Sequence, residues 1–516
     1  MKSLFRVKSL DALRSDSDDP RGQLKRTLGP VQLTALGVGA IIGAGIFSTV
    51  GTAAAGGANH TGAGPALIVS FVLVAVACSF AALCYAEFAA MVPIAGSAYT
   101  YAYATLGELV AWIIGWDLIL EYAVGNVAVA ISWSGYFQEL LRGLHVSLPA
   151  WLGIDYRSAA DAARQIALAR AHGDLAAMTP QLLHDAGALG AAPRLFGVPI
   201  ILNVPAFAIV MLITWVLVRG IRESAHLNTV MVAIKLAIIV FFVGVGAFFI
   251  KPQNWHPFAP NGFAGVSSAA AIIFFAYIGF DAVSTAAEET KNPQRDMPIG
   301  IVASLAVSTI VYILVALVLT GLLPWRELGT AEPLATAFSR LGMNWTAGVI
   351  AVGAVVATTS VLFVFQLGQA RIFFSMGRDG LLPSWSARVH PKYRTPHVTT
   401  ILTGVAVAIF SSVTNINEVV ELTNIGTLFA FVLVATSIIL LRRRDPDRPR
   451  PFRTPLVPLV PMLAIASCLY LMTELPWVTW RRFFVWLAVG LVVYFAYSRR
   501  RSRLAVPEPV PVPADS

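Results

Sequence analysis

The sequence predicts an all-α polytopic membrane protein, and three observations predict this fold. Hydrophobic residues make up 57% of the 516 residues and charged residues only 13%, whereas an ordinary soluble domain has about 25% charged residues. The apolar residues are gathered in runs long enough for membrane-spanning helices, which need about 20 residues each. The Lys and Arg residues lie mainly between these runs. A chain with so little polar surface needs lipid as its solvent.

Twelve apolar stretches are predicted to be transmembrane helices. They run over residues 31–56, 65–92, 107–133, 198–218, 226–250, 266–288, 297–322, 345–370, 397–413, 419–441, 454–473 and 479–498. The stretch 141–197 is predicted to be a polar extracellular loop with short helices. The first five helices (31–250) and the next five (266–441) would form two halves, followed by two extra helices (454–498).

The 37 Lys and Arg residues predict the orientation. Most of them fall in the arm 1–30, in the tail 499–516 and in the loops on the same side of the membrane. Positive residues gather on the cytoplasmic side, so both termini are expected there, in a bacterial inner membrane. The net charge of +9 is therefore interpreted as a topology signal and not as a nucleic-acid-binding surface. The first 30 residues lack the apolar core of a signal peptide, so no cleaved signal peptide is expected. The tail is expected to be disordered.

Glycines in the first span predict a break in that helix. Gly43, Ala44 and Gly45 fall near its middle, where no water can satisfy free backbone groups. Either neighbouring helices pack closely there, or the helix is unwound and a ligand completes the hydrogen bonds. An unwound segment exposes N–H groups at the start of the next half-helix, which suit a carboxylate. It also exposes C=O groups at the end of the preceding half-helix, which suit an ammonium group.

A second interruption follows five spans later. Gly279 is followed by the aromatic Phe280 and then by Asp281 at membrane depth. Paired interruptions in corresponding spans of two halves are typical of inverted-repeat transporters. An α-amino acid carries one carboxylate and one ammonium group, and two broken helices offer both complements. Close packing alone stays open as the alternative.

Three motifs resemble a known family. Gly39–Phe47 (GAIIGAGIF) resembles the first-helix signature of the amino acid–polyamine–organocation superfamily. Phe274–Gly300 resembles the sixth-helix signature of its cationic amino acid transporter branch, and Gln369–Pro383 the cytoplasmic end of its eighth helix. The resemblance covers roughly residues 25–500. It implies the LeuT-like 5+5 inverted repeat, with helices 1 and 6 discontinuous and two extra helices.

The resemblance also implies roles for individual residues. The backbone N–H groups near Gly43, Ala44 and Gly45 are expected to bind the substrate carboxylate. The C=O groups expected to bind its ammonium group are those of Ile41, Phe275, Ala276 and Ile278. Phe275 lies where relatives place a gating ring, with plain packing as the alternative, and Phe280 is a second candidate for the gate.

Lys235 is a charged residue inside the apolar fifth span, and such residues are functional by default. The resemblance implies that its ammonium group approaches the broken first helix, in place of the sodium ion of relatives. Loss and return of its proton would then couple transport to protons. The alternative is a side chain that reaches the membrane surface.

Polar groups in other spans are candidates for side-chain contacts. Asp281 and Glu121 could each attract a cationic substrate side chain or pair with another helix. Thr358 could face the cavity, although helical hydroxyls also bond their own backbone. Charged residues at the cytoplasmic ends of helices six and eight are expected to form a gate or a solvated loop: Glu288, Glu289, Lys291, Arg295, Asp296, Arg371, Arg378 and Asp379.

The resulting prediction is a secondary active transporter of L-amino acids, small neutral or cationic, coupled to protons and working by alternating access. It would need no metal, nucleotide or other cofactor, and its partners would be the amino acid, protons and membrane lipid. An exchanger or facilitator, and an amino acid sensor with the same fold, stay open. The sequence contains no HExxH, P-loop or GxSxG motif that would favour an enzyme.

Overall fold

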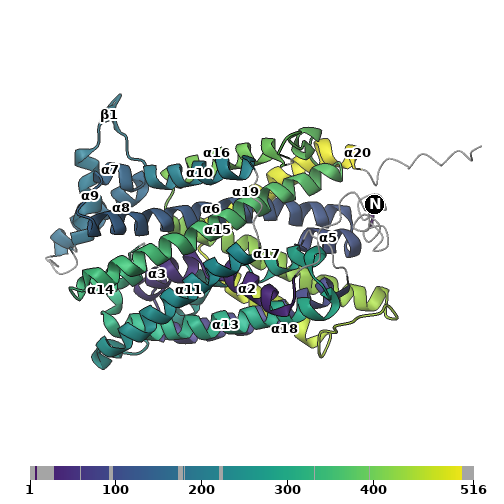
Figure 1. Ribbon diagram of the computed structural model, residues 1–516, viewed down its shortest axis with the longest axis horizontal. Helices are drawn as coiled ribbons and strands as arrows, with labels where there is room; N and C mark the ends of the chain where they lie inside the picture. The colour runs from purple at the N-terminus through teal and green to yellow at the C-terminus, as the bar shows by residue number, and fades with distance from the viewer. Residues whose placement is uncertain are drawn as a thin grey trace, which may run out of the picture.

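The computed structural model describes residues 6–7, 28–57, 60–91, 97–172, 178, 180–219, 225–330, 332–393 and 395–502. The arm 1–30 and the tail 499–516 therefore lie largely outside the described residues. In the described part the chain is almost entirely helical, and most of the long helices run along the long axis of the molecule (Figure 1). The predicted all-α polytopic class is confirmed.

Helical elements account for most of the chain. The longer ones are α2 (Pro30–Ile41), α4 (Leu67–Met91), α6 (Glu108–Gly143), α10 (Val204–Arg219), α11 (Ala225–Gly246), α12 (Gly262–Ile273), α13 (Pro293–Leu322), α15 (Asn344–Arg378), α16 (His397–Val413), α17 (Ile416–Arg444), α18 (Leu459–Thr473) and α19 (Trp477–Val493). The shorter ones that matter below are η1 (Gly45–Thr49), α3 (Val50–Ala55), α5 (Ser97–Thr105), η6 (Phe274–Tyr277), η7 (Asp281–Glu289), η8 (Trp325–Leu328), α14 (Pro333–Arg340) and η9 (Ser384–Ala387).

Every predicted span coincides with an apolar helix. Among the described residues, eight helices are long and apolar enough to cross a membrane, or nine if α2 and the bent η1–α3 segment count as one span. The remaining three ranges correspond to the shorter helices α10, α16 and α18, of 10–17 residues. Because these three are shorter than a typical span, the number of crossings stays a prediction.

Corresponding helices of the two predicted halves pack against each other. The second helices, α4 and α13, lie side by side, as do the third helices, α6 and α15, and the fourth, α10 and α16. A two-fold relation between the halves would produce this pairing. The division of the chain at residues 250 and 266 remains a prediction.

The polar loop 141–197 forms a small helical cap. It contains α7 (Ala150–Gly153), α8 (Tyr156–His172) and α9 (Pro180–Ala191), followed by a two-stranded hairpin, β1 (Arg194–Leu195) and β2 (Val198–Pro199). Arg157 on α8 is 2.5 Å from Glu418 on α17, which ties the cap to the helices. The cap lies at the opposite end of the molecule from α5 (Figure 1). The hairpin was not among the predicted elements.

Candidate functional site

Helix one is broken at the predicted glycines. The α2 segment ends at Ile41, Ile42 is extended, and π-helical turns resume at Gly45. The two segments are bent by 42°. We call Ile42, Gly43 and Ala44 the helix-one break.

Helix six changes geometry at the predicted place. The α-helical hydrogen bonding of α12 ends at Ile273, 3₁₀ turns follow as η6, and Ile278 is extended. Gly279 has a φ of +124°, a conformation that suits glycine because it has no side chain. We call Ile278, Gly279 and Phe280 the helix-six break; the 3₁₀ segment η7 begins directly after it.

The two broken helices touch each other through glycine. A Cβ atom added at Gly45 would lie 2.2 Å from the Cα of Ala276, and one at Gly279 would lie 2.9 Å from the carbonyl group of Ala40. Neither position therefore tolerates a side chain without movement of the opposite backbone. The segment predicted to bind the substrate carboxylate, around Gly45, is thus in direct contact with the segment around Ala276, which is predicted to bind the ammonium group.

Tyr312 on α13 connects the two broken helices. Its hydroxyl is 2.8 Å from the carbonyl oxygen of Ile41 and 2.7 Å from that of Ala276. Both are among the four carbonyl groups predicted to bind the substrate ammonium group. A hydroxyl has one proton, so it can fully satisfy only one of the two oxygens. Tyr312 was missed in the sequence, where its only signal is a tyrosine within an apolar run.

Lys235 on α11 points to helix one. Its side chain is 1% exposed, and its Nζ donates a hydrogen bond of 2.8 Å to the carbonyl oxygen of Gly39, in the last turn of α2. The Lys235 side chain is therefore directed at helix one and does not extend to the membrane surface, which was the alternative. In the described part of the chain no carboxylate forms an ion pair with it.

The buried carboxylates have different surroundings. Asp281 is 2% exposed, and its Oδ1 accepts a hydrogen bond of 3.2 Å from the N–H of Gly279. It therefore closes the turn of its own break. Glu121 and Asp117 are buried on α6. Both oxygens of Asp117 lack a hydrogen-bond partner among the described residues, and they face Gly426 on α17.

The remaining candidates are packed side chains. Thr358 donates a hydrogen bond of 2.6 Å to the carbonyl oxygen of Ala354 in its own helix, which is the alternative that the sequence left open. Phe280 is fully buried between Tyr85 and Phe431, with ring centroids 5.9 Å and 5.1 Å away. Phe275 is buried beside the break.

Contacts join the helices on both sides of the site. At the end where α5 lies, Leu28 pairs with Thr290 after η7, and Tyr99 on α5 donates a hydrogen bond of 2.7 Å to Asp379 after α15. Of the charged residues predicted at this end, Asp379 is thus placed in a contact, whereas the side chain of Glu288 lies outside the described part. At the other end, Tyr136 on α6 donates to the carbonyl oxygen of Phe47, and η8 packs on α3.

An all-α polytopic fold in which two interrupted helices contact each other is typical of secondary transporters. Residues 28–495 match the family described as amino acid permease. The chain therefore belongs to the amino acid permease family, within the amino acid–polyamine–organocation superfamily, as its motifs predicted.

Curated relatives cover almost the whole chain. It is 47% identical to the branched-chain amino acid permease BcaP of Bacillus subtilis, over 97% of this chain and 99% of that protein. It is 45% identical to the methylthioribose transporter of the same organism, over 98% and 100%. A vacuolar cationic amino acid transporter 4 of Arabidopsis thaliana is 36% identical over 87% and 68%. The protein is thus a multi-pass membrane transporter and not an enzyme, and the cationic transporters are more distant relatives than the bacterial ones.

Proposed function

We propose that the protein takes up L-amino acids together with protons, by alternating access around the two helix breaks. The observation that carries this proposal is the contact of the two broken helices at Gly45 and Ala276, beside their breaks, with Lys235 bonded to the end of α2. Both termini would lie in the cytoplasm and the protein in the bacterial inner membrane. The central site would use backbone groups and would need no cofactor.

The substrate carboxylate would bind at the start of η1. The N–H groups of Ala44 and Gly45 begin this half-helix, and free N–H groups at a helix start favour negative charge. The ammonium group would bind the carbonyl oxygens on the opposite side of the site, those of Ile41, Phe275, Ala276 and Ile278. Since the Tyr312 hydroxyl can donate to only one of its two carbonyl oxygens at a time, the other is available to an ammonium group.

A neutral, apolar side chain fits the surroundings best. Phe275 and Phe280 lie beside the break, and Asp281 is engaged with the N–H of Gly279. The 47% identity to a branched-chain amino acid permease supports the same choice. A cationic substrate is the second candidate, because Glu121 and Asp117 are buried carboxylates and neither forms an ion pair with another described residue.

Lys235 would be the proton-coupling group. When charged, its ammonium group holds the last turn of α2 through Gly39. A deprotonated lysine is a weaker donor, so loss of the proton would release α2 and let the first half of helix one move. Protonation from the outside and release to the inside would then accompany each cycle.

The test is uptake of labelled leucine, alanine and arginine into proteoliposomes, with and without an inward proton gradient. We expect gradient-driven accumulation of leucine or alanine in the wild type. Lys235→Ala is expected to lose that accumulation while keeping exchange of external for internal substrate. Lys251→Ala, which removes an exposed lysine after the end of the same helix, is the matched control.

Each outcome separates the candidates. Full proton-driven accumulation by Lys235→Ala would falsify coupling through this residue. Exchange without accumulation in the wild type would identify an exchanger, and preferential uptake of arginine would support the cationic substrate. If none of the three amino acids moved in either mode, a sensor with this fold would become the better proposal.

A further inference from the structure

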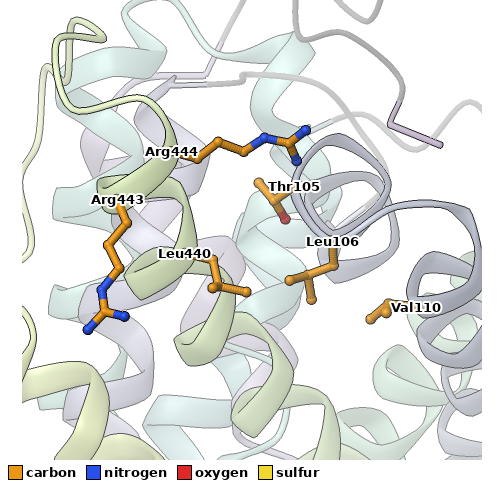
Figure 2. A pocket seen from close by; sticks show the side chains of 6 residues that line it. All are labelled: Thr105, Leu106, Val110, Leu440, Arg443 and Arg444. Atoms are coloured by element: carbon orange, nitrogen blue, oxygen red, sulfur yellow. The ribbon is translucent and has the colours of Figure 1, made fainter. Parts of the chain in front are cut away.

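A cavity separate from the helix breaks lies at the end of α17. Its volume is about 460 Å³, and it is lined by Thr105, Leu106, Val110, Leu440, Arg443 and Arg444. Thr105 ends α5, Val110 is in the first turn of α6, and the other two segments are the α5–α6 turn and the end of α17. Figure 2 shows the side chains of Leu440, Leu106 and Val110 in a row; the guanidinium group of Arg444 lies beside Thr105, and that of Arg443 lies on the other side of Leu440.

The three consecutive arginines at the end of α17 have different roles. Arg442 forms two hydrogen bonds of 2.9 Å with the carboxylate of Glu87, which is fully buried on α4. Arg442 therefore ties α17 to α4. Arg443 and Arg444 line the cavity, are exposed, and form no ion pair within the described chain. Their positive charges are available to a ligand.

The cavity lies at the boundary of the apolar part of α17. Apolar residues run up to Leu441, and the arginines follow directly. Such a change from apolar to basic residues marks the level of the lipid headgroups. Leu440 is 44% exposed, so the apolar wall faces away from the protein core. With the proposed orientation, this level belongs to the cytoplasmic leaflet, where anionic lipids bind basic pockets between helices.

We propose that this cavity binds an anionic phospholipid. The guanidinium group of Arg444, beside Thr105, holds the phosphate, because arginine offers paired N–H donors that match phosphate oxygens, and the nearby positive charge of Arg443 adds to the attraction for an anion. The first part of an acyl chain lies along Leu440, Leu106 and Val110. A soluble phosphate compound would use the arginines but would leave the apolar wall exposed to water, so the wall favours a lipid. The bound lipid bridges α17 and the α5–α6 turn.

The experiment measures thermal unfolding of the purified, detergent-solubilised transporter while lipid is added. Dioleoyl phosphatidylglycerol is expected to raise the melting temperature in a saturable way, and dioleoyl phosphatidylcholine to raise it much less. In Arg443→Gln/Arg444→Gln the half-saturating phosphatidylglycerol concentration should rise roughly tenfold or more, because charged hydrogen bonds to phosphate are lost. Inorganic phosphate and glycerol phosphate serve as headgroup controls.

Two further variants make the test specific. Arg388→Gln/Lys392→Gln removes two exposed positive charges in the segment between α15 and α16, outside the cavity, and should leave the phosphatidylglycerol response within about twofold. Leu440→Gln should weaken the response to phosphatidylglycerol but not the response to glycerol phosphate. It also keeps the proposal testable if the arginine double variant does not fold.

Three results would overturn the proposal. They are an unchanged phosphatidylglycerol response in the arginine double variant, an equal loss in the control double variant, and saturation by inorganic phosphate or glycerol phosphate with the same stabilisation as the lipid. The measurement does not depend on transport, so its failure would leave the proposed amino acid uptake untouched.

Discussion

The two broken helices contact each other beside their breaks, yet different interactions hold the helix-one break and the helix-six break. The helix-six break is fixed by its own residues, since Gly279 has a positive φ and donates to Asp281 two residues later. The end of α2, just before the helix-one break, is held by distant side chains: Lys235 on α11 bonds Gly39, and Tyr312 on α13 bonds Ile41 as well as Ala276 of helix six. A locally determined turn keeps its shape when its neighbours move. We therefore infer that helix one responds to protonation and substrate, while helix six provides a fixed frame.

The largest effect is expected where the two broken helices touch. Gly45→Val would place a side chain against the backbone of Ala276, whose Cα is 2.2 Å from the Cβ position. Backbone cannot turn aside as a side chain can, so the breaks would separate and uptake should fall by about 100-fold or more. Gly244→Val is the matched control, because nothing lies within 4 Å of its Cβ position on α11. Uptake and surface expression are measured together; comparable losses in both variants would contradict the contact.

Gly279→Ala should destabilise the protein through the helix-six break itself. A non-glycine residue at a φ of +124° costs on the order of 1–3 kcal/mol of unfolding free energy, and the Cβ would also press on the carbonyl group of Ala40. Gly262 also has a positive φ, but nothing lies within 4 Å of its Cβ position. Gly262→Ala should therefore lower the free energy of unfolding by less than Gly279→Ala. Thermal unfolding compares the two, and equal costs would show that the contact with helix one adds nothing.

Tyr312→Phe tests whether helix one depends on distant side chains. The change leaves the carbonyl oxygens of Ile41 and Ala276 without their shared donor, at a cost of about 1–3 kcal/mol. We expect the KM for the substrate to change by roughly tenfold. Tyr277→Phe removes a neighbouring hydroxyl that bonds Phe71 on α4 instead, and its KM should stay close to that of the wild type. A KM shift of the same size in both variants would remove the distinction between the breaks.

Local patterns allowed much of this arrangement to be predicted. The apolar runs predict the positions of the helices. Gly43, Gly45 and Gly279 predict the positions of both breaks, because the conformation of a break depends on the residues within it and beside it. Lys235 was found because a charge within lipid is costly and stands out. Tyr312 was not found, since its role arises only when α13 packs on both breaks. Arg443 and Arg444 were interpreted only as topology signals. The sequence does not show that, of the three consecutive arginines 442–444, only Arg442 pairs with Glu87.

A smaller effect is expected from Asp281→Asn. The amide oxygen of asparagine can still accept the hydrogen bond from the N–H of Gly279, so the helix-six break should keep its shape. Leucine uptake should then stay within a few-fold of the wild type, whereas Asp281→Ala, which loses the acceptor, should lose more. If the charge itself contacts a cationic substrate, arginine uptake alone will fall in Asp281→Asn. A loss of leucine uptake equal to that of Asp281→Ala would show that the charge, and not the turn, matters.

The second half of helix one, η1 and α3, is also held by side chains and helices from other parts of the chain. Tyr136 bonds the carbonyl group of Phe47, and α14 packs on η1. Glu332 lies directly before α14, and burial raises its pKa to about 7, partly opposed by Arg142.

A carboxyl group whose pKa is raised by folding stabilises the protein while it is protonated. That contribution is complete below the ordinary pKa of 4.5 and is lost as the pH rises towards 7. The free energy of unfolding should therefore fall between these pH values by on the order of 1–3 kcal/mol. Glu332→Gln, which cannot ionise, should flatten this part of the profile. Glu139→Gln on α6, with a nearby but more exposed carboxylate, should leave it in place; a wild-type slope retained by Glu332→Gln would place the titrating group elsewhere.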